Sequence, residues 1–243
     1  LGDGTTVDRP GPVHVCGSGA GEGCAGGAPL TGVISLTGGG VGDPNTGSTA
    51  SYTCALLQGG SVACWGANMR GALGDGTTTA HALPAPVCAS GSGPICAGGA
   101  PLSGTVGIAA GGDFACALMA NGTVKCWGND AAGQLGDGTQ GGPQHQRLNP
   151  VDVCITGSSS TCSLLTDVTA VAAGEASACA ALSTGAVVCW GANGFGQLGM
   201  GSTAPQANPA PVCASRDAAT CDANNREMNA AKRICAEVQI AAP

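Results

Sequence analysis

The chain has 243 residues, including 44 glycines and 15 cysteines, and its aromatic residues are three Trp, one Tyr and two Phe. Its formal net charge is −7 without a basic stripe, which argues against a nucleic-acid partner. No apolar run reaches the ~18 residues that a membrane-spanning helix needs. A core with so few rings must be built from small aliphatic residues and cysteines.

The chain opens with Leu-Gly-Asp-Gly, and a Leu-Gly-x-Gly turn recurs at Leu73, Leu135 and Leu198. Each later turn follows a cysteine and, ten positions on, a Cys-Trp-Gly motif. The tryptophans of these motifs are Trp65, Trp127 and Trp190, which are 62 and 63 residues apart. A fixed period of this size predicts a propeller, a solenoid or an array. Three copies of one unit rarely hold a single asymmetric catalytic site, so no enzyme is expected.

In chain order, we expect a partial unit at 1–32 with a strand over 12–16, units at about 33–104, 105–167 and 168–236, and a terminal strand at 237–243. Apolar or alternating runs in the middle unit predict strands at 105–110, 114–119, 123–127 and 149–154. Asn121-Gly122 is a strong hairpin signal between two of them. Four short antiparallel strands per unit describe a propeller blade. The predicted fold is therefore all-β, a β-propeller of four-stranded antiparallel blades with disulfide-pinched loops between them.

Fourteen cysteines fall into two classes of regularly spaced pairs. The hairpin pairs, ten residues apart, are Cys54/Cys64, Cys116/Cys126 and Cys179/Cys189. The loop pairs, eight residues apart, are Cys16/Cys24, Cys88/Cys96, Cys154/Cys162 and Cys213/Cys221. Opposed positions on neighbouring strands come close enough for a disulfide. Free buried cysteines are the simpler alternative, but they do not explain matched pairs in Gly-, Ser- and Ala-rich loops. We predict disulfides, and hence an extracellular or cell-surface protein.

Cys235 has no counterpart in the repeats. It follows residues 222–234, which predict a short helix capped by Asp222. An odd cysteine in an exported protein indicates an intermolecular partner or a reactive thiol. The alternative, a reduced cysteine or one whose mate lies outside this segment, stays open.

Other candidate sites have simpler explanations. A calcium site would need several oxygens close together, but each turn holds one Asp (Asp3, Asp75 and Asp137), and Met200 takes the fourth position. We interpret these as structural turns. The three tryptophans could stack a ligand, but their shared strand position favours a role in the structural core. Zinc is not expected, because no Cys-x-x-Cys occurs and the three His lie at different registers. No catalytic residue, cofactor or metal site is predicted, and Asn121-Gly122-Thr123 is a glycosylation sequon.

The repeat pattern also carries a family resemblance. The sequence Ala-Ala-Gly followed by Cys-Ala-Leu, then Gly-x-Val-x-Cys-Trp-Gly and Gly-Gln-Leu-Gly-Asp-Gly-Thr, is clearest over residues 109–151. It resembles the regulator of chromosome condensation repeat family. The resemblance implies a propeller, usually with seven blades. The repeats here are longer than the family's, with the extra residues between one unit's last strand and the next unit's first. This acidic, cysteine-paired chain is more similar to secreted bacterial members than to the nuclear exchange factor that names the family.

Three classes of function follow. The first is an extracellular, non-enzymatic structural or adhesive repeat protein, a self-assembling fibre or surface-layer subunit whose partners are other copies joined through the terminal strands. About three and a half blades cannot close a seven-bladed ring, so we expect a segment of a longer propeller or one that is completed by another copy. Each terminal half-blade would leave an unpaired strand edge, which invites strand addition between chains. The second class is a secreted propeller that binds or inhibits a protein. The third, a propeller lyase, would need a convergent polar funnel that the sequence does not contain. The sequence leaves open which small-molecule ligand, if any, the protein binds.

Overall fold

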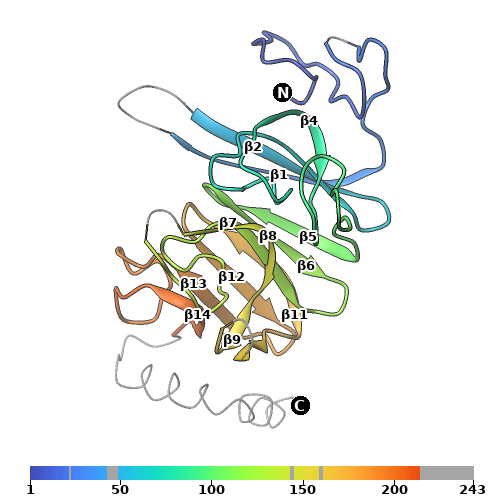
Figure 1. Ribbon diagram of the computed structural model, residues 1–243. Helices are drawn as coiled ribbons and strands as arrows, with labels where there is room; N and C mark the ends of the chain where they lie inside the picture. Colours follow the sequence, from blue (N-terminus) through green and yellow to red (C-terminus); the bar gives the residue numbers. More distant parts are fainter. Residues whose placement is uncertain (22, 43–48, 143–144, 159–160, 214–243) are drawn as a thin grey trace.

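The computed structural model describes residues 1–213, except 22, 43–48, 143–144 and 159–160. These residues form three four-stranded antiparallel sheets, each in the order of the chain, and one two-stranded sheet. The four-stranded sheets are the blades of a propeller, and they follow one another in a row (Figure 1). No helix of this part of the chain is both long and apolar enough to cross a membrane.

Each blade lies within one of the three predicted units. Blade 1 comprises β1 (Val33–Gly42), β2 (Thr49–Leu57), β3 (Val62–Gly66) and β4 (His81–Pro86). Blade 2 comprises β5 (Thr105–Ala110), β6 (Phe114–Met119), β7 (Val124–Asn129) and β8 (Gln146–Asp152). Blade 3 comprises β11 (Val168–Ala173), β12 (Ser177–Leu182), β13 (Val187–Gly191) and β14 (Gln206–Pro211). The sequence did not predict the short pair β9 (Cys154–Thr156) and β10 (Ser163–Leu164), which closes a loop between blades.

Hairpin turns set the register of the central strands in each blade. In blade 2, Gly122 adopts a φ of 78°, and Asn121 accepts hydrogen bonds from the backbone and hydroxyl of Thr123. This turn places Cys116 directly opposite Cys126. The same register pairs Cys54 with Cys64 and Cys179 with Cys189.

The hydrophobic core lies between the blades as well as within them. One cluster joins residues of blade 1 to Ala115, Ala117 and Trp127 of blade 2. A second joins residues of blade 2 to Ala178, Ala180, Val188 and Trp190 of blade 3. The first strands β1, β5 and β11 lie side by side where the blades meet.

The strand predicted over residues 12–16 is wrong. Cys16 makes only an isolated bridge to Pro29, and residues 12–15 form no strand. In blade 1 the equivalent Pro86 pairs with β3 of its own unit, and residues 1–32 contain no such partner strand. The predicted Cys213–Cys221 pair, the helix at 222–234, Cys235 and the terminal strand at 237–243 involve residues outside the described part of the chain.

Candidate functional site

The Leu-Gly-x-Gly turns are called latch loops here. In blades 1 and 2 they lie between the third and fourth strands and contact the next blade. Their residues are Leu1–Gly4, Leu73–Gly76, Leu135–Gly138 and Leu198–Gly201. The indole Nε1 of Trp127 donates a 2.9 Å hydrogen bond to the carbonyl of Ala72, immediately before the second latch loop. Nε1 of Trp190 likewise donates a 2.9 Å hydrogen bond to the carbonyl of Gln134, immediately before the third latch loop. Each of these loops therefore covers the tryptophan of the next blade.

The close approach of loop and indole requires glycine. A Cβ on Gly74 would lie 2.7 Å from Nε1 of Trp127, and the backbone there has a φ of +65°. Gly2 stands in the same relation to Trp65. All three tryptophans are buried, so their rings offer no surface for stacking a ligand. Trp127 and Trp190 pack in the cores between blades.

Backbone and amide groups extend the latch contact to the outer strand of the next blade. The amides of Gly76 and Gly138 donate to the carbonyls of Leu148 in β8 and Ala207 in β14. From those outer strands, the side-chain amides of two asparagines donate back to the preceding loop. Asn149 bonds Cys88 and Gly91, and Asn208 bonds Cys154 and Gly157. The sequence holds a signal for this contact, an Asn-Pro in the last strand, that the sequence analysis did not use.

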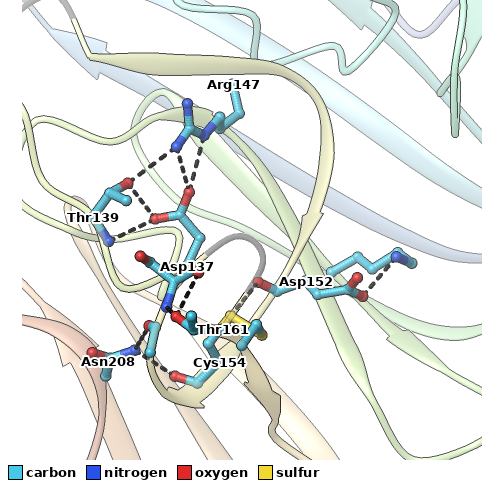
Figure 2. Close-up of a disulfide and its surroundings, with 11 residues drawn as sticks. Asp137, Thr139, Arg147, Asp152, Cys154, Thr161 and Asn208 are labelled. Atoms are coloured by element: carbon cyan, nitrogen blue, oxygen red, sulfur yellow. Dashed lines mark hydrogen bonds and ion pairs between the residues drawn. A yellow bond between two sulfur atoms is a disulfide. The ribbon is translucent and has the colours of Figure 1, made fainter.

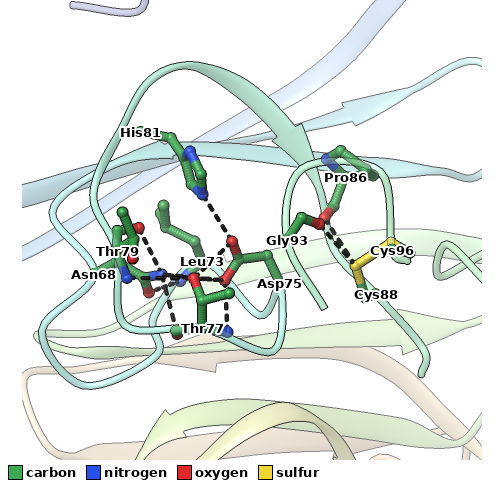
Figure 3. A network of polar contacts seen from close by, with 10 residues as sticks. All are labelled: Asn68, Leu73, Asp75, Thr77, Thr79, His81, Pro86, Cys88, Gly93 and Cys96. Carbon is green, nitrogen blue, oxygen red and sulfur yellow. Dashed lines mark hydrogen bonds and ion pairs between the residues drawn. A yellow bond between two sulfur atoms is a disulfide. The ribbon is translucent and has the colours of Figure 1, made fainter. Parts of the chain in front are cut away.

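The latch aspartates are engaged within their own turns. Asp75 accepts hydrogen bonds from Thr77 and Asn68 and lies 2.7 Å from Nε2 of His81 (Figure 3). Burial alone would raise the pKa of Asp75, but the hydrogen bonds from His81, Thr77 and Asn68 outweigh it and lower the pKa. The carboxylate oxygens of Asp75 face hydrogen-bond donors, and these donors would compete with a metal cation for the same oxygens.

The other two described latch aspartates are also engaged within their turns, each by an arginine and a threonine. Asp3 pairs with Arg9, and hydrogen bonding from Thr5 lowers the pKa of Asp3. Asp137 accepts from Thr139 and from Nε of Arg147 at 2.9 Å. Among the described residues, no three His, Cys, Asp or Glu gather as a metal-binding group. Arg9 and His81 lie six residues after their aspartates and Arg147 lies ten residues after Asp137. All three partners lie outside the Leu-Gly-x-Gly motif, so the motif did not identify them.

A buried amide three residues after each tryptophan holds the latch loop from within. Asn68 accepts a hydrogen bond from the amide of Leu73 and donates to the carbonyls of Thr77 and Thr79. Asn193 makes the equivalent bonds in blade 3. The sequence analysis did not identify these residues, although their position after Cys-Trp-Gly is fixed.

Blade 2 departs from this rule, because Asp130 takes the place of the asparagine. Asp130 still accepts from the amide of Leu135 and also from the hydroxyl of Thr139, but an ionised carboxylate cannot donate to backbone carbonyls. Nδ1 of His145 lies 3.0 Å from its second oxygen. Burial, together with the nearby charge of Asp137, raises the pKa of Asp130 to about 6.

We predict that Asp130→Asn stabilises the protein at neutral pH by about 1–2 kcal/mol, by restoring an amide donor and removing a buried charge. The pKa of Asp130 is higher in the folded chain than its ordinary value, so folding is coupled to proton uptake between pH ~4 and ~6. The stability contributed by this group is thus present below pH ~4 and lost as the pH rises to ~6. Urea unfolding at pH 4.5 and 7.5 measures both effects.

The free energy of unfolding gained by Asp130→Asn should therefore be larger at pH 7.5 than at pH 4.5. Asp137→Asn is the matched control, because it removes the ion pair with Arg147 and should destabilise the chain. An Asp130→Asn protein no more stable than the parent at pH 7.5 would contradict the prediction.

Cysteine pairs of both predicted classes lie at bonding distance. The hairpin disulfides join Cys54–Cys64, Cys116–Cys126 and Cys179–Cys189, with Cα atoms 4.0–4.1 Å apart. The loop disulfides join Cys16–Cys24, Cys88–Cys96 and Cys154–Cys162, with Cα atoms 5.2–5.3 Å apart. Figure 2 shows the Cys154 disulfide beside the latch pair Asp137–Arg147, with Asn208 of the next blade bonded to the same loop. The disulfide-closed loops are thus part of the contact between blades.

Two segments of the chain match the family described as the Regulator of chromosome condensation (RCC1) repeat, residues 106–134 and 168–197. Each begins at the first strand of a blade and ends just before the latch leucine. These two segments resemble RCC1 repeats.

Solved structures share the fold of these repeats. Human WBSCR16 matches with a TM-score of 0.53 and 22% identity, over 74% of this chain and 37% of that one. Prp20p from Saccharomyces cerevisiae matches with a TM-score of 0.54 and 16% identity, over 79% of this chain and 42% of that one. Yeast RCC1 (Prp20), in a structure with Kap60 bound, matches with a TM-score of 0.50 and 23% identity, over 68% of this chain and 34% of that one. The chain spans about two fifths or less of these chains, and the likeness confirms the predicted propeller fold.

The inner ends of the three described blades border a shallow hollow of about 640 Å³. It is lined by Gly38–Gly40, Ser51, Ala110–Gly112 and Ala173–Glu175. Glu175 is the one ionisable side chain among these residues, and no histidine or cysteine lines the hollow.

Proposed function

We propose that this chain is an extracellular, non-enzymatic protein-binding propeller segment that assembles with other copies of itself into a structural or adhesive array. The observation that carries the proposal is the contact repeated between the three described blades. Each of these contacts buries apolar side chains from two neighbouring blades. Further copies would extend the same kind of apolar contact, and apolar surfaces of this kind favour association.

The compartment and the absence of catalysis have separate support. The six disulfides of the described residues favour an oxidising environment such as the cell exterior. The central hollow offers glycine backbone and a single carboxylate, which suits contact with a partner better than chemistry. Yeast RCC1 (Prp20), whose fold resembles that of this chain, was solved with Kap60 bound to it. We extend only this general protein-binding role to the present chain.

Sedimentation velocity of the purified segment over a hundredfold range of concentration tests the proposal. We expect species larger than the monomer to grow with concentration. Cys235→Ser tests the further hypothesis that Cys235 locks the joint, since non-reducing gels should then lose covalent dimers while reversible association remains. A monomer at the highest concentration would overturn self-assembly and leave the second function, a propeller that binds or inhibits a different protein.

A further inference from the structure

One motif of the sequence has no part in the proposed function. Asn121-Gly122-Thr123 is the only Asn-x-Ser/Thr sequence among the 243 residues, and such a sequence is the acceptor for N-linked glycans in secreted proteins. The structure places it at the hairpin turn between β6 and β7 of blade 2 (Figure 1). Blade 2 has a described blade on each side, so the surroundings of this turn include both of its neighbours.

The turn packs against blade 3 through its glycine and leaves the asparagine exposed. The carbonyl of Gly122 accepts a 3.0 Å hydrogen bond from the amide of Val168, at the start of β11. A Cβ on Gly122 would lie 3.3 Å from the amide nitrogen of Asp167. Asn121 itself is exposed, whereas Thr123 is only 8% exposed. The acceptor side chain is therefore reachable from solvent, although the next residue touches the neighbouring blade.

The hydrogen bonds of the turn use only one end of the Asn121 side-chain amide. Oδ1 of Asn121 accepts from the backbone amide of Thr123 at 3.1 Å and from the hydroxyl of Thr123 at 2.7 Å. No described residue accepts a hydrogen bond from Nδ2 of Asn121. An N-linked sugar is attached through this nitrogen. A glycan on Asn121 would therefore leave both hydrogen bonds of the turn in place.

The fold does not require either of the residues that define the motif. The turn closes in the same way in all three blades, because the last residue of the second strand donates its amide to the carbonyl four residues later. At the positions of Asn121 and Thr123, however, blade 1 has Gly59 and Ser61, and blade 3 has Thr184 and Ala186. Neither the asparagine nor the threonine methyl and hydroxyl groups are needed to form this turn.

We propose that Asn121 is a modification site and carries an N-linked oligosaccharide on the exposed turn of blade 2. The co-reactant is an oligosaccharide joined to a lipid through pyrophosphate. The bond between Nδ2 and the anomeric carbon of the first sugar forms, and the bond from that carbon to the pyrophosphate oxygen breaks. The amide gives up one proton, and the lipid pyrophosphate leaves. The inference relies on export of the protein, which is one part of the proposed function, and not on self-assembly.

The modified turn and the central hollow lie at opposite ends of one strand. β6 begins at Phe114, just after Gly111 and Gly112 of the hollow, and ends at Met119, just before the turn. A glycan on Asn121 would thus place its bulky polar sugars away from the hollow. The hollow would stay open to a protein partner in the glycosylated protein.

Peptide mapping of the protein from its own source tests the inference. We expect the peptide with Asn121 to carry a sugar mass, and peptide N-glycosidase to remove that mass and convert the asparagine to aspartate. Variants secreted from a eukaryotic host then relate the modification to single side chains. Asn121→Gln and Thr123→Ala should lose the glycan, whereas Thr123→Ser should keep it.

The other blades supply matched controls. Ala186 and Ser61 already stand at the position of Thr123, so both Thr123 variants should fold, as checked by circular dichroism. Gly59→Asn places Asn-Gly-Ser in the turn of blade 1. Gly59 is exposed, a Cβ there meets nothing within 4 Å, and asparagine is the usual substitute for glycine at a positive φ in such a turn. This variant should gain a second glycan, which shows that the host modifies turns of this kind.

An unmodified Asn121 in the protein from its own source would overturn the inference. A Gly59→Asn protein that is glycosylated in blade 1 and bare at Asn121 would also overturn it, as would a glycan that survives Thr123→Ala. Intact disulfides beside a bare Asn121 would leave the export of the protein in place. Sedimentation velocity measures self-assembly separately, so the glycan and the proposed function can each fail alone.

Discussion

Replacing Trp127 with alanine is expected to destabilise the protein by about 3–5 kcal/mol, the range typical of removing a large buried aromatic side chain. The ring is fully buried between blades 1 and 2, and its Nε1 donates to the carbonyl of Ala72. Alanine would leave a cavity in that core and an unpaired carbonyl beside the second latch loop. Urea unfolding, followed by far-ultraviolet circular dichroism, measures the loss.

Two further variants separate packing from other roles of the tryptophan. Trp127→Phe keeps most of the ring volume but loses the hydrogen bond, so it should cost less than Trp127→Ala. Trp65→Ala should also cost less, because the latch loop over Trp65 belongs to residues 1–4 and not to a whole neighbouring blade. If Trp127→Ala kept full stability but lost binding to a partner, the tryptophan would be a ligand-stacking residue instead.

The sequence predicted features that are set within one unit. Cysteine spacing and the Asn121-Gly122 turn depend on neighbouring strands of a single hairpin, and local chemistry determines their register. The repeat period predicted the blades for the same reason. The strand expected over 12–16 failed because strand pairing needs a partner, and pattern alone does not supply one.

Contacts between units were not predictable in this way. The glycines of the latch loops were recognised as turns, but their approach to the next blade's indole depends on how blades stack. The roles of Asn149 and Asn208 depend on the same stacking. Asp130 was missed for a different reason. Its departure from Asn68 and Asn193 is visible in the sequence, but its meaning requires the buried carbonyls that the asparagines bond.

Complete reduction is expected to unfold the chain. By the loop-entropy model, each eight- or ten-residue bridge contributes roughly 2.5–3 kcal/mol. Six such bridges exceed the ~5–15 kcal/mol by which most domains are stable, and the core between blades has few aromatic rings to compensate. We expect loss of the near-ultraviolet circular dichroism signal on reduction and alkylation under native conditions, and its retention after alkylation without reductant.

Peptide mapping without reductant should link Cys116 to Cys126 and Cys154 to Cys162. The two classes should also differ when removed singly. Ala substitution at both Cys116 and Cys126 alters the buried centre of blade 2 and should lower the global free energy of unfolding. Ala substitution at Cys154 and Cys162 should act mainly on the loop that Asn208 anchors, and hydrogen exchange there should rise before global stability falls. Free thiols at these four positions, or a reduced chain that keeps its fold, would contradict both the stabilising role of the bridges and the inference of an oxidising compartment.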